Sequence, residues 1–137
     1  MVLLALNVIS AFAETTIYTA VVAENQTPSH DKKDSFNCTE NIHAVVEFQD
    51  ISVGQHELRV RWFAPSGKKR EDTSHKFWAA QETERVWSWL KLHRETGAGL
   101  LRWVVPSAGM DEFIGEWKVS LDLDGVYLGE SRFNVLC

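Results

Sequence analysis

The clearest pattern in the chain is an alternation of apolar and charged residues with a period of two. In residues 55–63 the alternating positions are Leu58, Val60 and Trp62 against Glu57, Arg59 and Arg61. Successive side chains of a β-strand point to opposite faces, so this stretch predicts a strand with one core face and one solvent face. Gly54 before it and Pro65-Ser66-Gly67 after it are typical turn residues.

The carboxyl-terminal region shows the same alternation twice. Residues 117–123 place four apolar side chains on one face: Trp117, Val119, Leu121 and Leu123. Phe133 and Val135 continue the inward pattern on a returning strand. Asp124-Gly125 between them suits a two-residue primed turn, which needs positive φ. We therefore expect a β-hairpin with Asp122 and Asp124 on its wet face, solvated and ionised.

Five further stretches are predicted to be extended: residues 16–23, 43–49, 77–80, 86–92 and 100–105. The last of these is either a short strand or an extended loop, and residues 24–39 form a long polar loop. We expect no helix, because Val, Trp and Ser at alternating places in 83–94 favour a strand. Short strands separated by turn signals predict an all-β, two-sheet sandwich.

Two groups of residues resemble a known fold family. The first is Gly54-x-His56 followed by Trp62, Pro65 and Gly67, and the second is Gly115-x-Trp117-x-Val119, Asp124-Gly125, Leu128-Gly129 and Phe133-x-Val135. Both are similar to hairpins of small exported bacterial domains of immunoglobulin-like fold, over roughly the second two-thirds of the chain. The resemblance implies an immunoglobulin-like antiparallel β-sandwich of about seven to eight strands.

The amino terminus predicts export. Residues 2–13 are uncharged and mostly aliphatic, too few to span a bilayer, and they end in Ala11-Phe12-Ala13, an A-x-A cleavage pattern. We expect residues 1–13 to be a signal segment that is truncated at its start, since no Lys or Arg precedes the apolar run. Residues 14–137 would then form one domain in a periplasmic or secreted protein. The alternative is that residues 2–13 form a buried first strand.

Cys38 and Cys137 are the two cysteines of the chain. Paired cysteines of exported proteins usually form disulfides. We expect a bridge between them, which would close a loop of roughly 100 residues and hold the last strand. The alternatives are two thiols, or an intermolecular bridge through Cys137.

Composition and motif spacing argue against several functions. The net charge of -5 disfavours nucleic acid as a partner. The basic group Lys68-Lys69-Arg70 is followed by two acidic residues, so we expect a solvated loop tip.

The five histidines are scattered without metal-ligand spacing, and we expect His56 to support a turn or to pack near Trp62. No nucleophile motif is present. We expect no enzymatic activity, no cofactor, no metal and no membrane span.

Tryptophans are the best candidates for a binding surface, since six are many for this length. Trp62 and Trp117 fall on inward faces and are expected in the core. A binding surface would come from the remaining four: Trp78, Trp87, Trp89 and Trp103. The leading hypothesis is a non-enzymatic binding or accessory domain that recognises a protein partner in the bacterial envelope. The alternative is a carbohydrate-binding module that uses Trp87 and Trp89. These two rings could instead cover the second sheet or pack under the long loop at residues 94–114.

Overall fold

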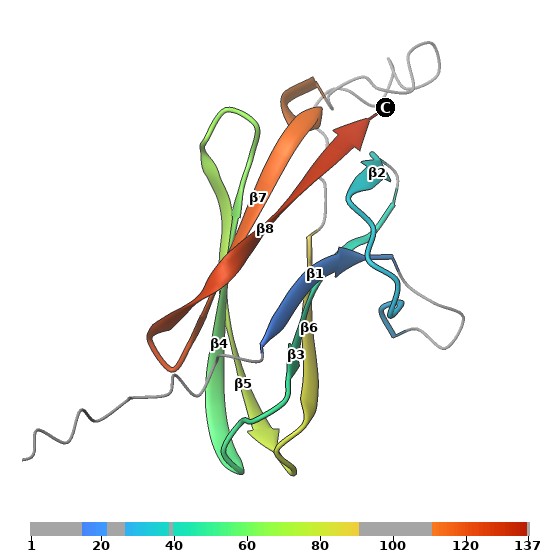
Figure 1. The fold of residues 1–137 in the computed structure, drawn as a ribbon. Helices are drawn as coiled ribbons and strands as arrows, with labels where there is room; N and C mark the ends of the chain where they lie inside the picture. Colours follow the sequence, from blue (N-terminus) through green and yellow to red (C-terminus); the bar gives the residue numbers. More distant parts are fainter. Residues whose placement is uncertain (1–14, 22–26, 39, 91–110, 137) are drawn as a thin grey trace, which may run out of the picture.

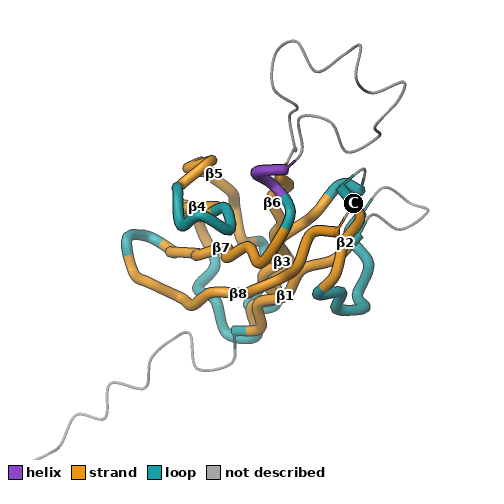
Figure 2. Tube along the Cα trace, turned by 90° about the horizontal axis from the view of Figure 1, so that it is seen from above, coloured by secondary structure: helices purple, strands orange, loops and turns teal. Residues whose placement is uncertain are grey.

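The chain folds into two β-sheets packed against each other (Figure 1). The structure is a computed structural model and describes residues 15–21, 27–38, 40–90 and 111–136. These residues form eight strands, three in one sheet and five in the other, and a single 3-10 turn at Asp111–Phe113 (Figure 2). The predicted all-β immunoglobulin-like sandwich of seven to eight strands is therefore confirmed.

The smaller sheet has the order β1-β3-β6, and all of its pairs are antiparallel. Its strands are β1 (Thr16–Ala20), β3 (Ile42–Phe48) and β6 (Glu84–Leu90). The register aligns Tyr18 with Val45 and Val45 with Trp87 across the sheet. β1 and β6 are thus the two edges of this sheet.

The larger sheet has the order β2-β8-β7-β4-β5. Its strands are β2 (Ser35–Asn37), β4 (Gly54–Phe63), β5 (Lys69–Ala79), β7 (Gly115–Leu123) and β8 (Val126–Leu136). The pairs are antiparallel except that β2 runs parallel to β8. The predicted primed turn between β7 and β8 is confirmed, since Asp124 has φ 50° and Gly125 has φ 81°.

The core lies between the sheets and is built from the inward positions of the alternating pattern. Trp62 and Trp117 are fully buried there, as predicted, with Phe133 packed against both rings. The Trp117 indole also donates a hydrogen bond to the Phe113 carbonyl at 2.7 Å. A second, smaller cluster lies on the outer face of the three-stranded sheet and contains Tyr18, Ala20 and Val45, with Trp87 packed on it.

Three predictions about elements need correction. The stretch at 77–80 does belong to an edge strand, as expected, but it is only the end of β5, which pairs with β4 from Lys69 onward. The predicted solvated loop tip is therefore partly strand, and Arg70 pairs with Glu112 at 3.0 Å and lies over the Phe113 ring. The predicted long loop contains β2.

Some predicted segments lie outside the described residues. These are the signal segment at 1–13 and the extended stretch at 100–105. The limits of the mature domain therefore stay a prediction. In the part of the chain that the structure describes, no helix has the length and apolar character needed to cross a membrane.

Candidate functional site

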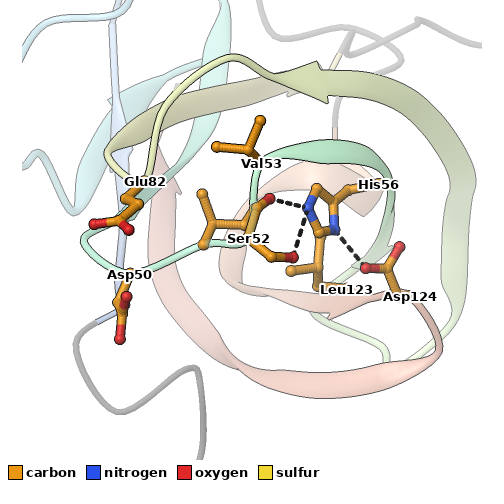
Figure 3. A pocket seen from close by; sticks show the side chains of 8 residues that line it. Asp50, Ser52, Val53, His56, Glu82, Leu123 and Asp124 are labelled. Atoms are coloured by element: carbon orange, nitrogen blue, oxygen red, sulfur yellow. Dashed lines mark hydrogen bonds and ion pairs between the residues drawn. The ribbon is translucent and has the colours of Figure 1, made fainter.

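The candidate site is a pocket at one end of the sandwich, the lower end in Figure 1. Three connections meet there: residues 49–53 between β3 and β4, residues 80–83 between β5 and β6, and the β7–β8 turn. The pocket has a volume of about 440 Å³. Its lining residues are Asp50, Ile51, Ser52, Val53, His56, Glu82, Leu123 and Asp124 (Figure 3).

His56 lines this pocket from a position near the start of β4. Its ring lies between Ser52 and Asp124 (Figure 3). Nδ1 is 2.6 Å from Oδ2 of Asp124, and Nε2 is 2.6 Å from the Ser52 carbonyl oxygen. The Ser52 hydroxyl is also near Nε2, at 3.4 Å. The ring is only 8% exposed and packs beside Phe77, with centroids 5.7 Å apart.

Asp124 is held in place by β4 as well as by His56. Its Oδ1 accepts a hydrogen bond from the Glu57 N–H at 2.8 Å, and its own N–H donates to the Glu57 carbonyl at 2.9 Å. Asp tolerates the left-handed backbone that this turn position requires. Asp124 therefore ties the β7–β8 turn to β4 by three hydrogen bonds, two through its carboxylate and one through its backbone N–H.

The electrostatics of the pair favour an ionised ring and an ionised carboxylate. Burial by itself would lower the pKa of His56, but the hydrogen bonds to Asp124 and to the Ser52 carbonyl outweigh it and raise the pKa. Burial by itself would raise the pKa of Asp124, but the bonds from His56 and from the Glu57 N–H lower it below its usual value.

The order Ser52, His56, Asp124 resembles the hydrogen-bonded series that activates a serine nucleophile, but the proton positions differ. A general base must offer a lone pair to the serine hydroxyl. Here the carboxylate and the Ser52 carbonyl are both acceptors, so both ring nitrogens must carry a proton for both bonds to form. In this state His56 is a doubly donating cation that joins two connections, and it cannot accept a proton from Ser52.

No prediction from sequence brought His56 and Asp124 together. The two residues are 68 positions apart, and their contact follows from the pairing of β4 with β7. His56 does support turns, as expected, although it packs on Phe77 and not near Trp62. The expectation for Asp122 was wrong. This side chain is buried on the outer face of the sheet, where Arg61 pairs with it.

The candidate tryptophans that the structure describes lie on different sheets. Trp78 lies on the outer face of β5 and is 68% exposed. It lies at the same end of the sandwich as the pocket, because its neighbour Ala79 pairs with Gly54 at the start of β4. Trp87 and Trp89 share the outer face of the other sheet, as their spacing predicted. Trp89 is 48% exposed, whereas Trp87 is half-buried against the second cluster. Trp103 lies outside the described residues.

The face that carries Trp87 and Trp89 consists of three cross-strand rows. The rows are Thr16-Glu47-Arg85, Tyr18-Val45-Trp87 and Ala20-His43-Trp89. Arg85 is engaged within the protein, since its guanidinium donates to the Tyr18 hydroxyl and to the carbonyls of Pro28 and Ser29. It also lies over the Tyr18 and Trp87 rings. Trp89 is therefore the main exposed aromatic ring of this face.

Cys38 follows β2 directly and packs half-buried against the core. Its N–H donates to the Leu136 carbonyl at 3.1 Å. Cys137 lies outside the described residues, so the disulfide stays a prediction.

Within the described ranges, no three side chains of His, Cys, Asp or Glu are placed to hold a metal ion together. Asp50 and Glu82 stand on the side of the pocket away from Asp124 (Figure 3). The expected lack of a metal or cofactor stays a prediction.

Comparisons with known proteins show likeness of fold only. No protein-family model and no curated protein matches the chain. One similar structure is an alkylpurine DNA glycosylase of Pseudomonas fluorescens bound to DNA with an abasic site analogue, at 13% identity and TM-score 0.47, covering 91% of this chain and 31% of that one. Another is a CARDB domain from Pyrococcus furiosus in complex with di-metal ions, at 12% identity and TM-score 0.41, covering 90% and 88%.

The glycosylase match corrects one prediction. The statement that this chain is not an enzyme is wrong as it stands, because one of the similar structures is an enzyme. The chain spans 31% of the length of that glycosylase. A TM-score of 0.47 assigns no reaction to this chain.

Proposed function

We propose that the chain is an exported domain of a bacterial envelope that recognises a protein partner through the end of the sandwich carrying the His56 pocket. The partner segment combines a basic residue with an apolar one. The basic residue lies against the carboxylates of the pocket, and the apolar one covers the exposed side chains at its rim.

The observation that carries this proposal is the position of Trp78. It is the most exposed of the large hydrophobic side chains that the structure describes, at 68%, and Val53 on the pocket rim is also exposed. Apolar side chains that stay in water gain free energy when a partner covers them, and tryptophan is enriched among the residues that dominate binding energy. One end of the domain therefore presents the chemistry of a protein interface.

The charge of the pocket indicates what kind of partner fits. Asp50, Glu82 and Asp124 line it, and no Lys or Arg is among the described lining residues. Within the described part of the chain, the carboxylates of Asp50 and Glu82 have neither an ion pair nor a side-chain hydrogen bond. Charge complementarity steers association and suppresses wrong partners, so a cationic segment is favoured over an acidic one.

A matched peptide panel tests the proposal. Short peptides that pair Lys or Arg with Leu or Phe are compared with versions in which Glu replaces the basic residue, and binding is measured by calorimetry. We expect binding of the basic series and a loss of roughly tenfold or more for Trp78→Ser. Leu136→Ser is the control, because Leu136 is similarly exposed, at 58%, but lies at the opposite end of β8 from the β7–β8 turn. Equal binding of both series, or no effect of Trp78→Ser, would contradict the proposal.

A second candidate function rests on the outer face of the three-stranded sheet. Trp87 and Trp89 lie there at alternate positions, and Trp89 is half exposed. An exposed indole can stack on a sugar ring, so this face supports glycan binding as the alternative. Tryptophan fluorescence titrated with a glycan panel, with Trp89→Ala as the comparison, separates the two. No shift with any sugar would exclude this candidate.

A further inference from the structure

His56 holds together two connections that are far apart in the sequence. Nε2 bonds to the Ser52 carbonyl of the 49–53 connection, and Nδ1 bonds to Asp124 of the β7–β8 turn. Both connections line the pocket. The shape of the pocket therefore depends on a ring that bridges two of its walls.

The bridge requires a charged ring. A neutral imidazole has one N–H and one lone pair, while the two partners are both acceptors. When the ring loses a proton, one of the two bonds must break. The carboxylate is the stronger acceptor, because hydrogen bonds to an ionised group are roughly twice as strong as neutral ones. Nδ1 therefore keeps its proton for Asp124, and the bond to the Ser52 carbonyl is lost.

Ser52 also offers the partner that the neutral ring needs. Its hydroxyl lies 3.4 Å from the same Nε2 that bonds to its carbonyl. A hydroxyl can donate to a lone pair, and a small rotation brings it into bonding range. One residue thus presents an acceptor to the charged ring and a donor to the neutral ring.

We propose that His56 is a proton-operated switch in which Ser52 is held through its carbonyl when the ring is charged and through its hydroxyl when the ring is neutral. The exchange moves the 49–53 connection and removes one positive charge from the pocket. The control of partner binding by this switch rests on the proposed function. The switch itself does not depend on it.

The groups around His56 are consistent with titration of this one ring. Asp124 contacts it from the β7–β8 turn, while Asp50 of the 49–53 connection and Glu82 of the 80–83 connection line the same pocket. From the edge strand β5, the uncharged ring of Phe77 packs beside the His56 ring. Glu57, the next residue of β4, is exposed. The acidic groups all favour the charged ring, and the hydrogen bonds to Asp124 and Ser52 raise the pKa of His56 against the effect of burial.

Nitrogen-detected NMR of the histidine side chains, followed by pH titration of the unbound protein, tests the switch. We expect both His56 nitrogens to be protonated at low pH and only Nδ1 above the transition, which lies above pH 6.5. The amide signals of Ser52 and Val53 should shift with the same midpoint. A neutral ring protonated on Nε2, or amide signals that do not follow the ring, would overturn the proposal.

Two substitutions test the two halves of the switch separately. Ser52→Ala keeps the carbonyl but removes the hydroxyl, so the neutral state loses its partner and the midpoint should rise by roughly half to one pH unit. Asp124→Asn removes the charge that favours the protonated ring, so the midpoint should fall by roughly one to three units. An unchanged midpoint in Ser52→Ala would contradict the role of the hydroxyl in the neutral state. An unchanged midpoint in Asp124→Asn would contradict the role of the carboxylate in the charged state. His75→Gln is the matched control, since His75 bonds to hydroxyls outside the pocket and should leave the midpoint unchanged.

Binding of the basic peptides completes the test. Loss of the His56 charge should strengthen their binding by roughly fivefold across the transition, for charges about 8 Å apart at an intermediate dielectric. His56→Gln should make the affinity independent of pH in this range. If the NMR transition occurs but peptide affinity does not follow it, the control of binding is wrong. If no peptide binds at any pH while the NMR transition occurs, the proposed function fails and the switch stands.

Discussion

The N–H of Cys38 donates a hydrogen bond to the carbonyl of Leu136, at 3.1 Å. This bond continues the parallel pairing of β2 with β8, in which Asn37 lies opposite Leu136. A residue near the start of the domain is therefore fixed beside the residue that precedes Cys137. The same pairing would hold the end of β8 if the two cysteines are joined.

We predict that Cys38→Ser destabilises the protein by about 3–5 kcal/mol, because a bridge over roughly 100 residues restricts the unfolded chain. Urea unfolding under non-reducing conditions measures the loss. Cys137→Ser should cost the same, and the double variant should cost no more than either, since one bond is removed in each case. Alkylation of both thiols in the native, unreduced protein would show that no bridge exists.

The two buried core tryptophans should differ in their response to the same substitution. Trp117 donates its indole N–H to the Phe113 carbonyl, whereas the buried Trp62 indole nitrogen has no hydrogen-bond partner among the residues that the structure describes. Replacement by Phe removes similar volume at both sites, but at Trp117 it also leaves a carbonyl unsatisfied. Trp117→Phe should therefore cost about 1–3 kcal/mol more than Trp62→Phe. Equal losses in chemical denaturation would refute the stabilising role of this bond.

Much of the fold follows from local pattern. The alternation at 55–63 and at 117–123 places Trp62 and Trp117 inward, and both are buried. Asp124-Gly125 forms the turn that its residues require. The failure at β5 has a physical reason. β5 is an edge strand, so one of its faces meets solvent and its inner face meets only the margin of the other sheet, where His75 contacts Ser88 of β6. Both faces of β5 therefore carry polar residues, and the alternation of apolar and polar positions that marks the other strands is missing from its sequence.

The candidate site could not be predicted in the same way. Nothing near His56 in the sequence indicates that its partner is Asp124, because the contact depends on which strands are neighbours in the sheet. The spacing of Trp87 and Trp89 correctly predicts a shared face. Their different exposure depends on the second cluster, to which Tyr18 of β1 contributes from a distant part of the chain.

The ion pair between Arg61 and Asp122 should contribute more to stability than a typical surface pair. Its side chains are only 25% and 12% exposed, on the outer face of the larger sheet. Asp122→Asn keeps the shape but leaves the Arg61 charge poorly compensated, so we expect a loss of about 1–3 kcal/mol. Glu116→Gln is the matched control on the same face. Its pair with Arg132 is more than half exposed and should contribute below about 1 kcal/mol. Similar losses at the two sites would contradict this ranking.

The pair of His56 and Asp124 predicts how stability depends on pH. The raised pKa of His56 means that its contribution is complete below the ordinary value of 6.5 and is lost as the pH rises through the folded value. The lowered pKa of Asp124 means that its contribution is complete above the ordinary value of 3.8 and is lost as the pH falls through the folded value. The pair therefore stabilises the fold most between these two ordinary values. A double-mutant cycle of His56→Gln and Asp124→Asn at several pH values should give a coupling energy of about 1 kcal/mol in this window and less on either side, since Asp124 is half exposed. A coupling energy that grows above pH 7 would have the wrong sign and would show that Asp124 does not favour the charged ring over the neutral one.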